Sequence, residues 1–224
     1  MVPLVEKPQT IEELCHRVVQ YDPKADLDML RLAYAFADEA HEGQKRASGE
    51  PYIIHPLATA FNLAEMHLPT PILVAGLLHD VPEDTTKTLD DIRINFGEDV
   101  ASMVSGITKL SKIKYRGMER YIENLRKMFL AMAADVRVVF IKFADRLHNL
   151  QTLDSIPPKN QYRIALESLE IYAPIANRLG MGDMKGKLED AAKREAEEKQ
   201  EKVAFFWLVF IKLRLPRVTQ GNKD

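Results

Sequence analysis

An uninterrupted apolar run, Ile72–Leu78, leads directly into a segment with four ionisable side chains. These are His79, Asp80, Glu83 and Asp84. The run is typical of a helix buried in a core, and Pro82 disfavours helical geometry at the residue before it. We therefore expect His79 and Asp80 on the last turn of that helix. Charged groups beside a core element are costly unless they are paired or bound to metal. The fold must supply this segment with specific partners.

Helical periodicity dominates the rest of the chain. Residues 26–42 place apolar side chains along one face, and Gly43 supplies a stop signal. The same reasoning predicts helices over 55–65, 71–80, 88–95, 97–108, 118–133, 136–152 and 159–178. Breaker pairs indicate an ordered loop over 44–54, and 110–117 is basic and poorly periodic. No alternating strand pattern persists, so the expected fold class is all-α, a helical bundle.

Length and composition exclude several classes of protein. The 224 residues, 46% of them hydrophobic, are enough for one domain with a sizeable core. A net charge of −2 gives no basic field for non-specific binding of nucleic acid. Cys15 is the only cysteine, which excludes a disulfide framework and a thiolate zinc site. The N-terminal sequence has no secretory signal and no apolar run approaches the roughly 20 residues of a membrane span, so we expect a cytoplasmic protein.

Two imidazoles and two carboxylates form a candidate metal-ligand set: His55, His79, Asp80 and Asp145. Mixed donors of this kind favour octahedral Mn²⁺, Fe²⁺ or Mg²⁺, and facing helices of a bundle can bring distant positions together. A divalent metal lowers the pKa of water, which indicates hydrolysis. Alternatives remain for single residues. His55 is also explained as a helix-start residue, and Asp145 as an ion-pair partner of Arg146 or of a neighbouring helix.

Two further groups of residues carry charge near this set. The basic stretch with Lys109, Lys112, Lys114 and Arg116 either attracts an anionic nucleotide or is a solvated loop. Arg146 and His148 are expected to form hydrogen bonds in the core or behind the metal ligands rather than to touch a substrate.

Longer stretches of the chain resemble the hydrolase domain of the RelA/SpoT homologue family, a branch of the HD phosphohydrolase superfamily with the signature H…HD…D. The matching stretches are HEGQKRASGEPYIIHPLATA (41–60), LLHDVPEDT (77–85), GITKLSKIKYRG (106–117), NLRKMFLAMAADVRVVFIKFADRLHNLQTL (124–153) and YAPIANRLGM (172–181). They cover most of residues 20–185. The resemblance implies an HD-domain helical bundle over residues 1–184.

The resemblance also implies roles for individual residues. It implies Mn²⁺ as the metal at His55, His79, Asp80 and Asp145, with Glu83 and Asp84 orienting or deprotonating the attacking water. Arg46 would stack on a guanine base. By the same resemblance, Ser48, Asn149 and Thr152 would contact the base, ribose or phosphates. Lys45 and Lys112 are further candidate contacts because of their charge. The chain departs from the family at Ala47, where a second basic residue is usual, and Lys45 is a candidate to compensate.

The activity implied is hydrolysis of the 3′-pyrophosphate of guanosine tetra- and pentaphosphate, (p)ppGpp, to GDP or GTP and pyrophosphate. Two alternatives stay open. One is a phosphohydrolase that acts on another nucleotide such as NADPH. The other is a sensor module that binds the nucleotide without turning it over, which Ala47 modestly favours.

Residues 185–224 form an expected extension beyond the resemblance. Its first part, 185–202, is a charged helical run, and 203–213 (VAFFWLVFIKL) is strongly apolar. A segment this apolar must be shielded from water by other apolar surface. A helix docked on the core is the first interpretation, self-association into an oligomer the second, and contact with a membrane surface the third. Stable membrane insertion is not expected.

Overall fold

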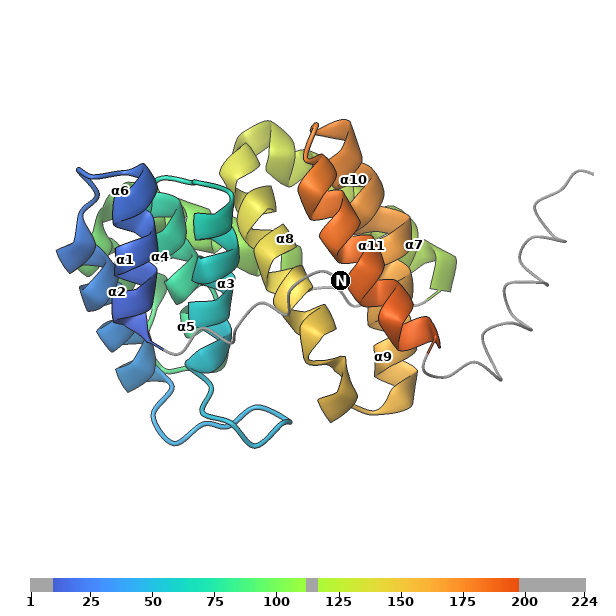
Figure 1. Ribbon diagram of the computed structural model, residues 1–224, viewed down its shortest axis with the longest axis horizontal. Coiled ribbons are helices and arrows are strands. Elements are labelled where there is room, and N and C mark those ends of the chain that lie inside the picture. Colours follow the sequence, from blue (N-terminus) through green and yellow to red (C-terminus); the bar gives the residue numbers. More distant parts are fainter. Residues whose placement is uncertain (1–9, 112–116, 198–224) are drawn as a thin grey trace, which may run out of the picture.

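The structure of the protein is a computed structural model (Figure 1). In it the apolar run forms the buried helix α4 (Thr70–Leu78). Leu73, Val74 and Leu77 have no exposed surface. Full burial of each such side chain stabilises the fold by about 1.5–3 kcal/mol. The packing partners of this helix include α2 (Leu27–Ala40), α3 (Ile54–Glu65), α6 (Leu89–Ser111) and α8 (Val136–Gln151).

The structure describes residues 10–111 and 117–197, and within these ranges it contains helices and no strand. A single isolated β-bridge joins Lys45 and Pro51 in the loop that precedes α3. The all-α fold class is therefore confirmed. Among the described helices, none combines the length and apolar character needed to cross a membrane.

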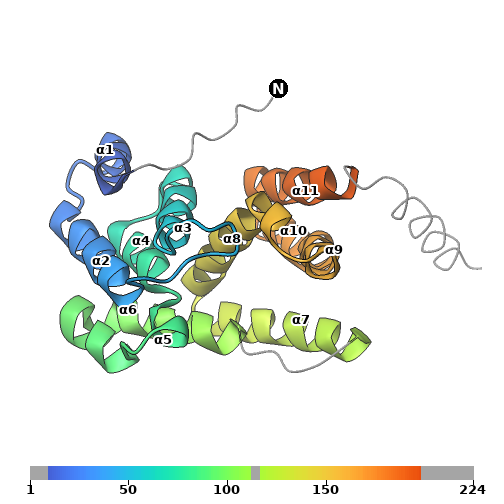
Figure 2. The ribbon, with the colours of Figure 1, turned by 90° about the horizontal axis from the view of Figure 1, so that it is seen from below.

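Helix α8 lies between two groups of helices (Figures 1 and 2). On one side it packs against α3, α4 and α6, and on the other against α11 (Gly182–Glu197). The remaining elements of the second group are α9 (Pro158–Glu167) and α10 (Ala173–Arg178), with α7 (Gly117–Ala134) along one edge. A side chain on α8 can therefore meet residues that are far away in the sequence.

The helix boundaries follow the sequence signals closely. Gly97 has a positive φ of 84° and divides α6 into the two helices predicted over 88–95 and 97–108. The helix predicted over 159–178 is interrupted by a π-helical turn, η2 (Ser168–Tyr172), between α9 and α10. Helix α1 (Ile11–Tyr21), which the periodicity argument left out, begins at a capping box of Thr10 and Glu13.

The end of α4 differs slightly from the prediction. The helix ends at Leu78, and His79 and Asp80 occupy the following turn with right-handed helical dihedral angles. A further short helix, α5 (Val81–Asp84), was not predicted. It forms because Pro82 at its second position has the φ of a first helical turn and needs no hydrogen-bond donor there. Asp80 and Asp84 thus lie at the two ends of one helical turn.

The expected boundary between residues 184 and 185 falls inside α11. Leu188 and Ala192 of this helix have no exposed surface and belong to the core, and α11 packs against α8, α9 and α10. The predicted charged helix is thus present to Glu197. The apolar segment 203–213 and the basic residues Lys112, Lys114 and Arg116 lie outside the described residues.

Candidate functional site

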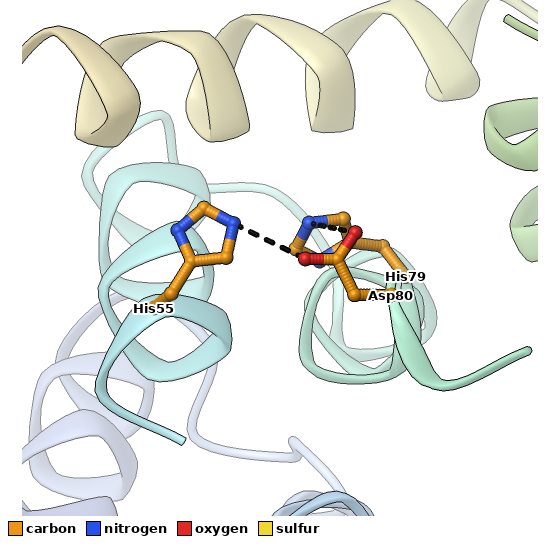
Figure 3. Close-up of side chains that lie close together, drawn as sticks. All are labelled: His55, His79 and Asp80. Carbon is orange, nitrogen blue, oxygen red and sulfur yellow. Dashed lines mark ion pairs between the residues drawn. The ribbon is translucent and has the colours of Figure 1, made fainter. Parts of the chain in front are cut away.

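The four predicted metal ligands meet where α3, α4 and α8 approach one another. Ligand atoms of His55, His79 and Asp80 all lie within 4.8 Å of one another (Figure 3). Asp145 falls outside this mutual limit, but its Oδ1 lies 3.3 Å from Nε2 of His55 and 3.9 Å from Nε2 of His79. The fold therefore brings together two imidazole nitrogens and two carboxylates from three separate helical regions.

His79 is oriented by the end of α4. Its Nδ1 lies 2.8 Å from the carbonyl oxygen of Gly76 and can only donate to it, so Nε2 is the ring atom that can offer a lone pair to a metal when the ring is neutral. That Nε2 atom is buried and has no hydrogen-bond partner. It lies 3.1 Å from Oδ1 of Asp80. A buried nitrogen lone pair beside carboxylate oxygens is the arrangement that a divalent cation would satisfy.

His55 is held from the opposite side. It lies in the first turn of α3 and is 1% exposed. Its Nε2 lies 3.4 Å from Oδ2 of Asp80, and its Nδ1 lies 2.7 Å from Nδ1 of His148 on α8. Burial, together with the neighbouring His55, lowers the pKa of His148 to about 3. His148 is thus a neutral ring behind His55.

Asp145 is held by two neighbours on its own helix. Lys142 donates to Oδ2 at 2.7 Å, and Asn149 donates to Oδ1 at 2.5 Å. Burial opposes the charge on Lys142, but Asp145 outweighs it and raises the pKa of the ammonium group. The lysine therefore stays charged and secures one carboxylate oxygen, while the other oxygen points toward the two imidazoles. The ion pair with Arg146 that was the alternative for Asp145 is not formed, since Arg146 donates to Glu167 and Tyr172.

The charges of the cluster are strongly coupled. Burial opposes a charge on the His79 ring, but Asp80 outweighs burial and raises the pKa of His79 to about 9. Burial likewise opposes ionisation of Asp80, yet His79 and His55 keep the pKa of this carboxyl well below its usual range. Without a metal, the His79 ring therefore holds a proton beside ionised carboxylates, and a bound cation would have to replace that proton.

Glu83 and Asp84 lie on α5, one turn beyond Asp80, and both are exposed. Burial of part of the Glu83 side chain, together with the charge of Asp80, raises the pKa of its carboxyl group. Asp84 accepts a hydrogen bond from the hydroxyl of Tyr52 at 2.8 Å. Both carboxylates are therefore exposed to solvent beside the cluster, and Asp84 is joined to it through Tyr52.

Tyr52 is a site residue that the sequence argument missed. Its hydroxyl oxygen lies 2.9 Å from Oδ2 of Asp80 and 2.8 Å from Oδ2 of Asp84, so it can donate to either carboxylate. The Tyr52 ring stacks on His41 with 4.3 Å between centroids. Gln44 bonds Nδ1 of His41 and also donates to the carbonyl oxygen of Asp84. The loop before α3 thus connects the cluster to α5.

The predicted nucleotide-binding residues are brought together only in part. Arg46 of the loop donates to Oδ1 of Asn149 at 3.0 Å, which places both beside Asp145. Ser48 instead donates to Glu50 within the exposed tip of the loop, and Lys45 is an exposed residue of the β-bridge. Thr152 caps α8 and donates to the carbonyl oxygen of His148. Lys112 lies outside the described residues.

One face of α8 contributes several of the residues around the cluster. Positions 145, 148, 149 and 152 are spaced by three and four residues, so their side chains form one stripe along the helix. Lys142, three residues before Asp145, extends this stripe, and the spacing alone was a signal that could have identified it. For Tyr52 no comparable signal exists, because its partners Asp80 and Asp84 come from another part of the chain.

Comparisons with known proteins identify relatives over most of the chain. The bifunctional (p)ppGpp synthase/hydrolase SpoT of Escherichia coli K12 is 51% identical over 180 residues, which are 80% of this chain and 26% of that protein. A GTP pyrophosphokinase of Myxococcus xanthus is 48% identical over 181 residues, 79% of this chain and 24% of that protein. The chain thus spans about a quarter of the length of these curated relatives.

A solved structure shows the same fold. It is described as a metazoan orthologue of SpoT that hydrolyses ppGpp, and it matches with a TM-score of 0.54 at 21% sequence identity. The match covers 77% of this chain and 96% of that chain. A family model described as HD domain matches residues 33–182, which include all four predicted metal ligands. With the expected fold, the His-Asp cluster and this match over most of its length, the chain belongs to the HD domain family.

Proposed function

We propose that the chain hydrolyses the 3′-pyrophosphate of (p)ppGpp with the help of a divalent metal. The first candidate for this metal is Mn²⁺, and its ligands would be His55, His79, Asp80 and Asp145. The observation that carries the proposal is the buried, unpartnered Nε2 of His79 beside Asp80 and opposite His55. It is supported by the names of the relatives. One, from Vibrio cholerae, is a guanosine-3′,5′-bis(diphosphate) 3′-pyrophosphohydrolase that is 51% identical over 172 residues.

The donor set suits such a metal because hard or borderline cations accept imidazole nitrogens together with carboxylate oxygens. When bound, a divalent cation would activate water and neutralise charge on phosphate oxygens. Lys142 prepares Asp145 for this role, since it engages Oδ2 and leaves Oδ1 directed at the imidazoles.

The acid and base of the reaction are assigned to Glu83 and Asp84. In the proposed step the water oxygen forms a bond to the phosphorus next to the ribose, and the bond from that phosphorus to the 3′-oxygen breaks. One carboxylate takes a proton from the water, and the other, in its protonated form, gives its proton to the 3′-oxygen, so that GDP or GTP and pyrophosphate leave. The pKa of Glu83 is raised toward neutral pH, and a general acid or base is most effective when its pKa lies near the pH of the reaction.

Recognition of the nucleotide is assigned to the loop before α3 and to the stripe on α8. Arg46 presents a guanidinium plane that can stack on a purine, and its hydrogen bond to Asn149 joins it to the residue that bonds Asp145. Lys45 and Ser48 of the same loop and Thr152 at the end of α8 are assigned further contacts to the base, ribose or phosphates. Lys112 has the charge for a phosphate contact and keeps its proposed role from the sequence alone.

The test is to incubate the protein with ppGpp and Mn²⁺ and to measure the release of pyrophosphate. We expect turnover by the wild type and none by His79→Ala, because that variant removes the nitrogen at the centre of the cluster. His16→Ala serves as the matched control, since His16 is exposed on α1 and has no part in the cluster. Its turnover should equal that of the wild type.

Two alternative functions have their own outcomes in the same experiment. A markedly higher rate on NADPH than on ppGpp would assign the chain to another nucleotide. Binding of ppGpp in calorimetry without any release of pyrophosphate in Mn²⁺ would assign it to a non-catalytic sensor. Loss of activity in the His16→Ala control would show that the assay reports stability instead of chemistry.

A further inference from the structure

Two buried histidines contact each other directly behind the candidate metal centre. Nδ1 of His55 and Nδ1 of His148 are 2.7 Å apart, and their ring centroids are 5.0 Å apart. The exposed fractions of the two residues are 1% and 8%. A separation this short between two ring nitrogens is a hydrogen bond, so one nitrogen donates a hydrogen and the other accepts it.

The direction of this bond follows from the other nitrogen of His55. Nε2 faces Asp80 at 3.4 Å and Asp145 at 3.3 Å, and it is the atom that would coordinate the metal. A coordinating nitrogen must offer its lone pair, so in the metal-bound site the ring hydrogen of His55 has to be on Nδ1. Nδ1 of His148 must then be the acceptor, and His148 carries its own hydrogen on Nε2.

The placement of His148 on α8 adds a second consequence. His148 lies three residues after Asp145, on the same stripe of the helix. One helix therefore supplies a proposed metal ligand and also the group that orients a second ligand, which is on α3. His148 cannot itself coordinate the metal through Nδ1, because that nitrogen is already bonded to His55.

We propose that His148 is a positioning residue that accepts a hydrogen bond from Nδ1 of His55 and so holds the His55 ring with Nε2 directed at the metal. The proposal rests on the metal site of the proposed function. It predicts that the acceptor at position 148, and not the imidazole ring as such, sets metal affinity. Loss of such an outer hydrogen bond typically weakens metal binding by about 10- to 100-fold.

A pair of variants separates the acceptor from the ring. His148→Asn retains an oxygen acceptor close to the place of Nδ1, whereas His148→Leu has a similar branched shape without any acceptor. Titration of the full chain with Mn²⁺, followed by electron paramagnetic resonance of the free ion, should show affinity reduced about 10- to 100-fold in His148→Leu. His148→Asn should keep most of the wild-type affinity. Thermal melting without metal verifies that both variants are folded.

A measurement on the wild type covers the case in which His148→Leu does not fold. In protein labelled with nitrogen-15 at histidine and loaded with diamagnetic Zn²⁺, we expect a through-hydrogen-bond coupling between Nδ1 of His55 and Nδ1 of His148. The coupled hydrogen should be bonded to His55. Packing of the two rings without a hydrogen bond gives no such coupling.

The outcomes distinguish this inference from the proposed function. A wild-type chain that binds no Mn²⁺ would overturn the metal site and this inference with it. Binding by the wild type together with unchanged affinity in folded His148→Leu, or equal weakening in His148→Asn and His148→Leu, overturns the positioning role alone. So does a spectrum in which the shared hydrogen belongs to His148 or in which no coupling is seen.

Discussion

Nε2 of His55 lies 3.3 Å from Oδ1 of Asp145, so the first turn of α3 and the middle of α8 meet at one point. This contact closes the candidate metal centre, because the remaining pair, His79 and Asp80, comes from the end of α4. The packing of α3, α4 and α8 against one another therefore has a direct chemical consequence.

Substitution of Asp145 should weaken the stabilisation of the protein by bound metal. The proposed ligands meet only in the folded chain, so saturating Mn²⁺ should raise the melting temperature of the wild type. In Asp145→Asn this increase should be strongly reduced, because a neutral amide replaces the carboxylate. Asp154→Asn is the matched control, since Asp154 is exposed beyond the end of α8. Thermal melts with and without Mn²⁺ decide the question, and equal increases in both variants would exclude Asp145 as a ligand.

Substitution of Glu83 should impair turnover of ppGpp and leave metal binding intact. A general acid or base typically contributes about 10²- to 10⁴-fold to a rate, so Glu83→Gln should lose activity on that scale. The raised pKa of Glu83 is consistent with such a role. Glu42→Gln, an exposed residue after α2, should retain full activity. Mn²⁺ affinity measured on both variants verifies the separation, and a large loss of affinity in Glu83→Gln would contradict it.

Removal of the Tyr52 hydroxyl should affect both carboxylates that it contacts. Tyr52→Phe keeps the ring stacked on His41 but loses the bonds to Asp80 and Asp84. Loss of such an orienting bond commonly reduces activity or metal affinity by about 10- to 100-fold. Steady-state turnover of ppGpp measures the effect. Tyr162→Phe, at an exposed position of α9, is the control, and identical rates for the two variants would show that Tyr52 has no positioning role.

Gly76 should be intolerant of a side chain because α3 and α4 approach closely there. A Cβ atom at this position would lie 2.5 Å from Cδ1 of Leu63, which is fully buried. Overpacking of this kind costs about 1–3 kcal/mol, so Gly76→Ala should lower the free energy of unfolding in urea by that amount. Gly186→Ala on α11 meets no atom within 4 Å and should stabilise the protein by up to about 1 kcal/mol. Destabilisation of equal size at both positions would contradict the packing argument.

Asp135, the N-cap of α8, should make the free energy of unfolding depend on pH in the acid range. Asp135 accepts hydrogen bonds from the backbone and side chain of Arg137, which hold the pKa of Asp135 below its usual value. The stabilisation is therefore complete above the unfolded pKa of about 3.9 and is lost as the pH falls through the lower folded pKa. At pH 7, Asp135→Ala should cost about 0.5–2 kcal/mol in urea unfolding.

The matched control at this cap is Asp135→Asn, which keeps an oxygen acceptor but removes the charge. It should cost less than Asp135→Ala at pH 7. The difference between the wild type and either variant should shrink when unfolding is repeated below pH 4. A difference that stays constant with pH would show that the charge of Asp135 has no part in the stability of α8.

Most helices were predictable because their signals are local. The apolar run of α4, the stop at Gly43 and the break at Gly97 each act within a few residues, and the structure has the corresponding boundaries. The short helix α5 was missed because a single turn has no periodicity. The π-helical turn η2 was also missed, since one inserted residue changes the hydrogen-bond pattern without any change in composition.

The candidate site was predictable where the residue types themselves are unusual. Histidines and aspartates beside an apolar run indicated His79 and Asp80, and the structure brings His55 and Asp145 to them. The contacts of Tyr52 and the pairing of His55 with His148 depend on the meeting of distant elements, for which one sequence contains no signal. Arg46 and Asn149 are bonded to each other, a contact that the family resemblance did not specify.

The stripe of positions 145, 148, 149 and 152 on α8 has a consequence for how this helix can vary. Replacement of one of these residues alters one contact. Insertion or deletion of a single residue upstream within the helix turns everything after it by about 100°. This rotation would turn the whole stripe away from α3 at once. A change in the length of α8 before Asp145 should therefore disrupt the site more than the substitution of any single residue in the stripe.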